Sequence, residues 1–256
     1  MAGGNVMRVD NEVLNVLSAA ECIGKNLKLT GQLDRNLYTK TNKVLEAAGG
    51  KWNRKAGAHI FEVDASDRIE QIILTGDVVV PKDDFEFFPT PKKIAEYVIE
   101  LADIKNGMKV LEPSAGRGAL AVAAQQSAID VKVDMFELMP DNNAYIHNLK
   151  IKNAKIGHPV DFLTVEPTPS FDRVVMNPPF SRQADIKHVN HAFKFLKPGG
   201  KLVSIMASSV TFRGNKLTTD FRCFVEKQGG YIEELPHGAF KESGTMVKTV
   251  IVIIPN

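Results

Sequence analysis

Residues 171–180 read Phe-Asp-Arg-Val-Val-Met-Asn-Pro-Pro-Phe, an apolar run that stops at two consecutive prolines. Proline lacks the amide hydrogen that a sheet ladder needs, so we predict a strand over 171–176 and a loop over 177–180. Open α/β sheets bind their ligands beyond the carboxyl ends of their strands. The loop is therefore where we expect a functional site.

The chemistry of this loop, Asn177-Pro178-Pro179-Phe180, is specific. The side-chain oxygen of Asn177 and the carbonyl oxygen of Pro178 can together accept both hydrogens of a planar NH2 group. Phe180 can then stack on the ring that carries the amine. Asn and Pro also form ordinary turns, so these residues alone leave a turn without function open. The candidate catalytic residues are Asn177, Pro178, Pro179 and Phe180.

From about residue 108 onward, short apolar runs alternate with helical segments, a pattern typical of βαβ units and a mostly parallel sheet. The last two apolar runs read as a hairpin, which adds an antiparallel element at one edge. The predicted fold is therefore α/β, with a Rossmann-like sheet. Strands are predicted over 109–112, 131–137, 171–176, 201–206, 231–235 and 247–254, and helices over 91–101, 118–127, 184–196 and 218–227.

The first of these strands runs into a turn at 112–118 that reads Glu-Pro-Ser-Ala-Gly-Arg-Gly. Glycine lets the backbone approach a ligand closely, and a helix N-terminus favours negative charge. Glu137 follows about twenty residues later at the end of the next strand, where an acid accepts hydrogen bonds from ribose hydroxyls. The turn lacks the third glycine of a pyrophosphate-binding motif, and the chain has no phosphate loop. These features predict a nucleoside-containing cofactor other than a nicotinamide dinucleotide.

Together, the glycine turn and the Asn-Pro-Pro-Phe tetrad resemble class I S-adenosylmethionine-dependent methyltransferases, and more narrowly the N6-adenine DNA methylases of phages and mobile elements. Residues 87–91, 161–163 and 240–245 extend the resemblance in family order over about 85–256. In the family, the first of these segments contacts the methionine end of the cofactor, and the second binds its adenine. The implied cofactor is S-adenosyl-L-methionine, and the implied contacts are Phe88, Thr90, Glu112, Ser114, Gly116, Gly118, Glu137, Leu138, Asp161, Phe162 and Asn177.

Other roles stay open for three of these residues, since Glu112 could orient the glycine turn, Asp161 could be a cap or a solvated loop residue, and Phe162 could be a core residue. The resemblance implies methyl transfer to the exocyclic N6 amine of adenine in DNA. Methyltransferases of RNA adenine and of protein glutamine share the same tetrad logic, and a non-catalytic DNA- or partner-binding protein on this fold is also open. The connections after the tetrad are too short for a large target-recognition domain, so we expect weak sequence specificity.

Residues 1–84 are expected to form a small α+β appendage to a methyltransferase domain at 85–256. Between residues 25 and 55, eight basic residues stand against two acidic ones, which predicts contact with nucleic-acid phosphates. Trp52 lies among them, and we expect it in the core of the appendage. Residues 62–84 are acidic and read as a linker. The candidate phosphate contacts are Lys51, Arg54 and Lys55, joined by Arg213 and Lys216 from a later polar loop.

The composition places few further demands on the protein. A net charge of only +2 means that any basic patch is local. Cys22 and Cys223 are far apart and outside any metal-binding or disulfide pattern, as expected in a reducing cytosol. His188 and His191 share one helix face without a third ligand, so we expect helix packing and no metal. The N-terminus lacks a signal-peptide pattern and no apolar run reaches membrane-span length, which predicts a cytoplasmic protein without a membrane partner.

Overall fold

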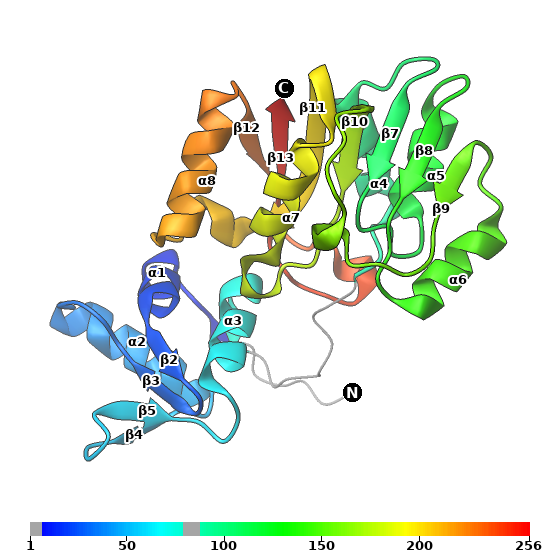
Figure 1. Cartoon of the computed structure of the whole chain (residues 1–256). Helices are drawn as coiled ribbons and strands as arrows, with labels where there is room; N and C mark the ends of the chain where they lie inside the picture. The colour runs from blue at the N-terminus through cyan, green and yellow to red at the C-terminus, as the bar shows by residue number, and fades with distance from the viewer. Residues whose placement is uncertain (1–6, 79–87) are drawn as a thin grey trace. The chain divides into compact units, whose positions relative to one another are not determined.

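The computed structural model describes residues 7–78 and 88–256, and the chain divides into two compact units (Figure 1). The first unit comprises residues 1–84 together with 208–219, and the second comprises 85–207 and 220–256. Phe87 and the segment 79–84 of the predicted linker lie outside the described residues. Segment 208–219 groups with the first unit, whereas the sequence placed it in the methyltransferase domain.

The second unit is built on a seven-stranded sheet in the order β12-β13-β11-β10-β7-β8-β9. The sheet has five neighbouring parallel strands, β11, β10, β7, β8 and β9. Strand β13 runs antiparallel to both β11 and β12. The predicted Rossmann-like α/β sheet with its antiparallel edge hairpin is thus confirmed. The strands are β7 (Lys109–Glu112), β8 (Lys132–Met135), β9 (Ala154–Ile156), β10 (Phe171–Met176), β11 (Leu196–Ala207), β12 (Tyr231–Glu234) and β13 (Thr249–Pro255).

The central strand β10 has the bounds expected from the sequence. Val174, Val175 and Met176 are fully buried, as expected for a parallel strand covered on both faces. Helix α4 packs against β10 and β11, α5 against β7 and β8, and α7 against β11. The helices are α4 (Lys92–Ala102), α5 (Ala119–Ser127), α6 (Pro140–Leu149), α7 (Ala184–Phe193) and α8 (Lys216–Lys227).

Strand β11 begins earlier than predicted, at Leu196 instead of residue 201, and α7 correspondingly ends at Phe193. The register against β10 jumps from Leu196 to Lys201, so the Pro198-Gly199-Gly200 turn forms an irregularity inside the strand. Gly199 has a φ of 76°, a left-handed conformation that costs glycine little. Helix α6 and strand β9 were not predicted, although Pro140 at the first turn of α6 is a helix-start signal.

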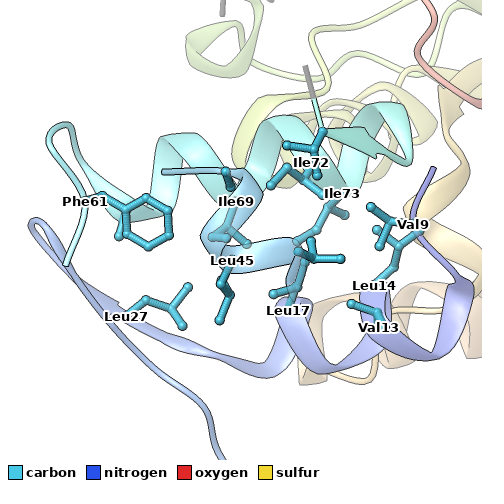
Figure 2. Close-up of a cluster of buried hydrophobic side chains, with 14 residues drawn as sticks. Val9, Val13, Leu14, Leu17, Leu27, Leu45, Phe61, Ile69, Ile72 and Ile73 are labelled. Carbon is cyan, nitrogen blue, oxygen red and sulfur yellow. The ribbon is translucent and has the colours of Figure 1, made fainter. Parts of the chain in front are cut away.

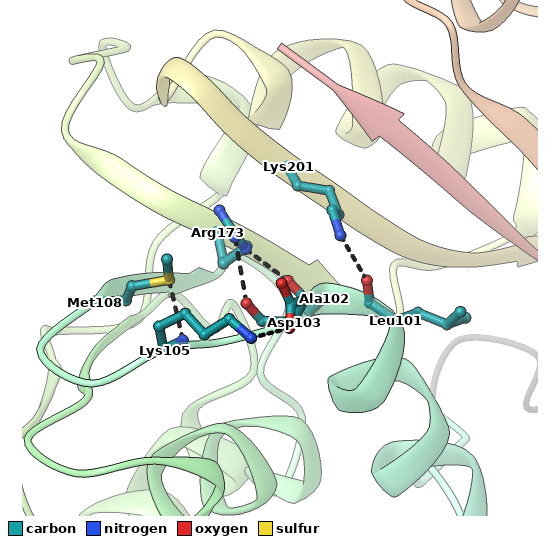
Figure 3. Close-up of polar contacts among 7 residues, drawn as sticks. All are labelled: Leu101, Ala102, Asp103, Lys105, Met108, Arg173 and Lys201. Atoms are coloured by element: carbon teal, nitrogen blue, oxygen red, sulfur yellow. Dashed lines mark hydrogen bonds and ion pairs between the residues drawn. The ribbon is translucent and has the colours of Figure 1, made fainter.

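Two basic side chains from adjacent strands hold the carboxyl end of α4 (Figure 3). Arg173 of β10 donates to the carbonyl oxygens of Ala102 and Asp103, and Lys201 of β11 donates to that of Leu101. The last carbonyls of a helix have no partner within the helix and carry partial negative charge. The cations therefore both satisfy these groups and fix α4 on the sheet.

Over residues 7–78, the first unit contains a four-stranded antiparallel sheet in the order β2-β3-β5-β4, a two-stranded sheet of β1 and β6, and three α-helices. Its core gathers Val13, Leu14 and Leu17 of α1 with Leu45 of α2 and Ile72 of α3 (Figure 2). The elements are β1 (Met7–Arg8), α1 (Asn11–Ala19), β2 (Glu21–Ile23), β3 (Asn26–Lys28), α2 (Arg35–Ala47), β4 (Lys51–Asn53), β5 (Ala58–Ile60), α3 (Ala65–Thr75) and β6 (Asp77–Val78).

The acidic stretch after β5 is not a linker over its described part. Asp64 accepts hydrogen bonds from the amides of Ser66 and Asp67 and so caps α3, an arrangement that typically adds about 1 kcal/mol. Ile69 and Ile72 of the same helix are core residues (Figure 2). The linker prediction was wrong because it rested on the number of acidic residues. In α3 these residues alternate with apolar ones that form a buried face of the helix.

Candidate active site

A cavity of about 280 Å³ lies at the carboxyl ends of the parallel strands of the second unit. Its walls come from the loops after β7, β8, β9 and β10 and from the segment that precedes α4, which is where α/β sheets of this kind bind ligands. The predicted site residues that line it are Phe88, Thr90, Glu112, Ser114, Gly116, Glu137, Leu138, Asp161, Phe162, Asn177, Pro178, Pro179 and Phe180.

The side-chain amide of Asn177 is held in one orientation. Its Nδ2 donates to the carbonyl oxygen of Phe88 at 3.3 Å and to Oγ1 of Thr90 at 3.1 Å. Its Oδ1 is buried and has no hydrogen-bond partner within the described part of the chain. Buried polar atoms are nearly always paired, so this unpaired acceptor on a residue that lines the cavity is unusual.

The segment that orients Asn177 is itself tied to the end of the chain. Ser243 Oγ donates to the carbonyl oxygen of Pro89 at 2.5 Å, and the neighbouring Phe240 is buried. Ser243 belongs to the 240–245 tail that the sequence singled out. The tail therefore supports residues 88–90, which in turn orient the tetrad.

Phe180 closes the tetrad as a buried wall of the cavity, only 4% exposed. The chain then turns sharply, and both Arg182 and Gln183 adopt left-handed φ values, 51° and 58°. Two consecutive non-glycine residues in this region carry backbone strain, which persists only where surrounding structure enforces it. The tight turn places Ser181 and Ala184 at the cavity directly after the tetrad.

The Glu137 carboxylate connects the turn after β7 with the segment after β8 through hydrogen bonds. Its Oε2 accepts the amide hydrogen of Gly116 at 2.6 Å, and its Oε1 accepts that of Met139 at 2.7 Å. The carboxylate thereby fixes the glycine turn after β7. Each carboxylate oxygen has a second lone pair, so the group can still accept hydrogen bonds from a ligand.

Glu112 is fully buried at the end of β7, and its Oε2 has no hydrogen-bond partner within residues 7–78 and 88–256. Burial raises the pKa of the Glu112 carboxyl well above its ordinary value, the charge of Glu137 raises it further, and a hydrogen bond from the Ala121 backbone opposes the shift. A cationic or hydrogen-bonding ligand beside the carboxyl would act in the opposite direction and lower this pKa.

Gly118 does not line the cavity, unlike the other residues predicted for the cofactor. It precedes α5 with a φ of 78°, and a Cβ there would lie 3.4 Å from Leu149 and 3.6 Å from Ile146. The left-handed backbone conformation is what favours glycine at this position, since a Cβ would make only ordinary van der Waals contacts with α6.

Asp161 caps the short helix at Phe162–Thr164 by accepting the amide hydrogen of Leu163 at 2.9 Å. Phe162 is buried, and its ring contacts those of Phe136 and His191 at centroid distances of 5.5 and 4.9 Å. Both Asp161 and Phe162 face the cavity, so capping and ligand contact are compatible roles.

The two histidines of α7 have different surroundings. His191 Nε2 lies 2.9 Å from the carbonyl oxygen of Val165, in keeping with the packing role expected for it. His188 lines the cavity, and its Nδ1 lies 3.4 Å from Oγ of Ser114. Burial lowers the pKa of His188 below its ordinary value, and the charge of Asp161 opposes this shift. No sequence signal distinguished it from His191, because only the packing of α7 decides which ring faces the cavity.

The predicted phosphate contacts fall into two groups. Lys51, Arg54, Lys55 and Lys216 are exposed. Arg213 is only 5% exposed and lies 2.6 Å from Oε2 of Glu70, an ion pair within the first unit. The prediction for Arg213 is wrong, because the residue anchors segment 208–219 together with Phe212, which packs on the core.

No cluster of three or more His, Cys, Asp or Glu side chains that could hold a metal ion occurs among residues 7–78 and 88–256. Over the same residues, the helices are too short or too polar to cross a membrane.

The cavity residues fit an adenosyl sulfonium cofactor. Glu137 offers acceptors for ribose hydroxyls, and Phe162 offers an aromatic face at the cavity for the base. Glu112 and Asn177 contribute buried acceptor oxygens without partners in the described chain, so a ligand with N–H donors and positive charge would satisfy them.

Comparisons with known proteins bear on the fold and the family of the chain. No curated protein matches the chain. A structure from Listeria monocytogenes, described as a class I S-adenosylmethionine-dependent methyltransferase, has a TM-score of 0.55 at 17% identity, over 75% of this chain and 68% of its own. The M protein of the EcoKI type I restriction enzyme has a TM-score of 0.55 at 15% identity, over 95% and 56%. A dimethyladenosine transferase from Plasmodium falciparum has a TM-score of 0.52 at 18% identity, over 66% and 64%.

At these identities the structural likeness shows a shared fold. The family is shown by residues 96–231, more than half of the chain, which match the model of the methyltransferase small domain. The chain therefore belongs to the methyltransferase small domain family, and its cofactor is S-adenosyl-L-methionine.

Proposed function

We propose that this protein methylates the exocyclic N6 amine of adenine in DNA with weak sequence specificity, as do enzymes of the phage and mobile-element type. The observation that carries this proposal is the geometry of Asn177, a residue that lines the cavity: its Nδ2 is held by Phe88 and Thr90, and its buried Oδ1 has no hydrogen-bond partner in the described chain. This orientation suits a ligand that donates a hydrogen bond from an amine.

Each tetrad residue would have its own role in binding the substrate. Asn177 Oδ1 and the carbonyl oxygen of Pro178 accept the two amine hydrogens, while Phe180 stacks on the purine. Pro179 keeps the loop from rejoining the sheet, since it has no amide hydrogen to donate. These contacts turn the nitrogen lone pair out of conjugation with the ring and toward the methyl donor, so positioning accounts for most of the catalysis.

The cofactor contacts are proposed residue by residue. Glu137 and Leu138 would contact the ribose, and Asp161 and Phe162 the adenine. Residues 112–116 and the Phe88–Thr90 segment would hold the methionine end. Bound S-adenosylmethionine supplies an electrophilic methyl group on a sulfonium. The attacked nitrogen becomes acidic only as it is alkylated, so the protein needs no strong base at this step.

Adenine in DNA is favoured over other amines by two features. Phe180 offers a flat aromatic surface that suits a purine, and the first unit exposes a basic hairpin that suits phosphate. The fold alone does not discriminate, since a restriction-system M protein and a dimethyladenosine transferase both share it. The absence of a large insertion after the tetrad is the reason to propose weak specificity.

The test is transfer of labelled methyl groups from S-adenosylmethionine to equal amounts of DNA, RNA and release-factor protein, followed by identification of the product. N6-methyladenine in DNA, spread over many sequence contexts, is the expected product. Label on RNA adenine or on protein glutamine, with none on DNA, would refute the substrate assignment. An Asn177→Ala variant serves as the catalytic control.

A further inference from the structure

The first unit carries an exposed tryptophan that its own core does not use. Trp52 is 53% exposed, whereas we expected it in the core from the sequence. The hydrophobic cluster of this unit contains residues of α1, α2, α3 and β3 and closes without it. An exposed tryptophan offers a large flat apolar surface with a polar N–H at one edge, which suits contact with a ligand.

The indole of Trp52 is held in place from behind. In the edge strand β4, Trp52 pairs with His59 of β5, and the two rings lie 5.1 Å apart at 59°. His59 is 1% exposed, and its Nε2 lies 2.8 Å from Oδ1 of Asn42 on α2. Asn42 also donates to Glu46 at 2.8 Å, which fixes its amide. His59 therefore supports one side of the indole, and the rest of the ring is exposed.

Positive charge surrounds this surface. Lys51 precedes Trp52, and Arg54 and Lys55 follow in the turn between β4 and β5. All three are exposed, and none forms an ion pair within the part of the chain that the structure describes. No acidic residue occurs between Glu46 and Glu62. Lys and Arg that lack protein partners are available to phosphate.

We infer that Trp52 is a stacking platform for an unpaired base of single-stranded DNA, with Lys51, Arg54 and Lys55 binding the neighbouring phosphates. Single strands are bound by aromatic side chains interleaved with basic ones, because every base has a face to stack and every nucleotide a charge. In a duplex those base faces are covered by neighbouring bases. The choice of DNA rests on the proposed function, in which adenine reaches the active site unstacked.

The chain offers a direct readout, because Trp52 is its only tryptophan. The fluorescence of the full-length protein is titrated without cofactor against single-stranded DNA, duplex DNA and single-stranded RNA of one sequence. We expect quenching by single-stranded DNA at lower concentration than by either competitor. Absence of quenching, equal quenching by the duplex, or tighter binding of RNA would each overturn the inference.

Variants separate stacking from charge. Trp52→Ala is expected to weaken binding of a labelled single strand by roughly five- to a hundredfold, while Trp52→Phe keeps most of the affinity and shows that the unit is folded. Replacing Lys51, Arg54 and Lys55 together by alanine should reduce the slope of log K against log salt by about 0.7 for each phosphate that the variant no longer binds. Lys132→Ala is the matched control, since Lys132 is exposed at the opposite end of the parallel strands from the cavity.

Failure of this inference is distinct from failure of the proposed function. If DNA is methylated at adenine while Trp52 gives no response to single strands, the platform is refuted and the function stands. If Trp52 is quenched by single-stranded DNA while methyl transfer goes to another substrate, the function is refuted and the binding site stands.

Discussion

Replacing Asn177 by alanine should abolish most catalysis while leaving the fold intact. The change removes Oδ1, a buried acceptor that no other described group satisfies, and Nδ2, which binds Phe88 and Thr90. Loss of one preorganised hydrogen-bonding group from a reaction centre costs about 2.7–4 kcal/mol of transition-state stabilisation, or roughly 100- to 1000-fold in kcat. The bond to the amine strengthens as the nitrogen gains positive charge, so the loss falls on kcat more than on KM.

The expected effect on stability is small, and this is the discriminating feature. An unpaired buried oxygen already costs free energy, so its removal offsets the absence of the two Nδ2 hydrogen bonds, and the net change in unfolding free energy should stay within about 1 kcal/mol. A purely structural asparagine would show the opposite pattern.

Asn143 provides the matched comparison, because it is 5% exposed, lies outside the cavity, and donates from Nδ2 to the carbonyl oxygen of Gly157 at 3.0 Å. Asn143→Ala should lower the unfolding free energy by about 1–2 kcal/mol with kcat unchanged. Steady-state methyl-transfer rates and thermal unfolding of both variants are the assays. Retention of more than about a tenth of the wild-type kcat by Asn177→Ala would refute the assigned role.

Three further predictions concern buried charges. The pKa of Glu112 in the folded protein is raised above its ordinary 4.5, so the wild-type unfolding free energy falls as the pH rises above that value. Relative to wild type, Glu112→Gln should therefore gain about 1.4 kcal/mol of unfolding free energy per pH unit until the pH passes the folded-state pKa. Unfolding of both proteins without cofactor, measured across pH, checks this. Arg213→Ala leaves Glu70 uncompensated and should cost about 3–5 kcal/mol in chemical denaturation, without altering the salt dependence of DNA binding. Arg173→Met leaves the carbonyl of Ala102 without its charged donor and should cost about 2–3 kcal/mol by the same measurement, with no change in cofactor affinity.

Much of the second unit could be predicted because its signals are local. A continuous apolar run bounded by proline or glycine marks a buried parallel strand, and β7 and β10 have the predicted bounds. Helix α6 lacks such a signal, since its ten residues include few apolar ones in helical register. The α7 to β11 junction was misplaced because Pro198-Gly199-Gly200 forms a turn within the strand.

The residues that mislead the sequence reading are those whose environment depends on distant partners. Arg213 was expected to be a solvent-exposed basic residue, but in the structure it forms an ion pair with Glu70. Trp52 was expected in the core, but in the structure residues of the three helices and β3 form the core without it. The cofactor role of Gly118 stays a prediction: the residue does not line the cavity, and the atoms nearest to a Cβ built there belong to Leu149 and Ile146 of α6.

The sequence by itself determines the α/β order of elements, the tetrad and the glycine turn, because strand ends, prolines and glycines act over a few residues. Only the tertiary structure decides that Phe88 and Thr90 orient the Asn177 amide and leave Oδ1 unpaired. It alone also brings His188 to the cavity and ties residues 208–219 to the first unit. Hydrogen bonding, burial and charge pairing depend on distances between residues far apart in the chain, and folding sets those distances.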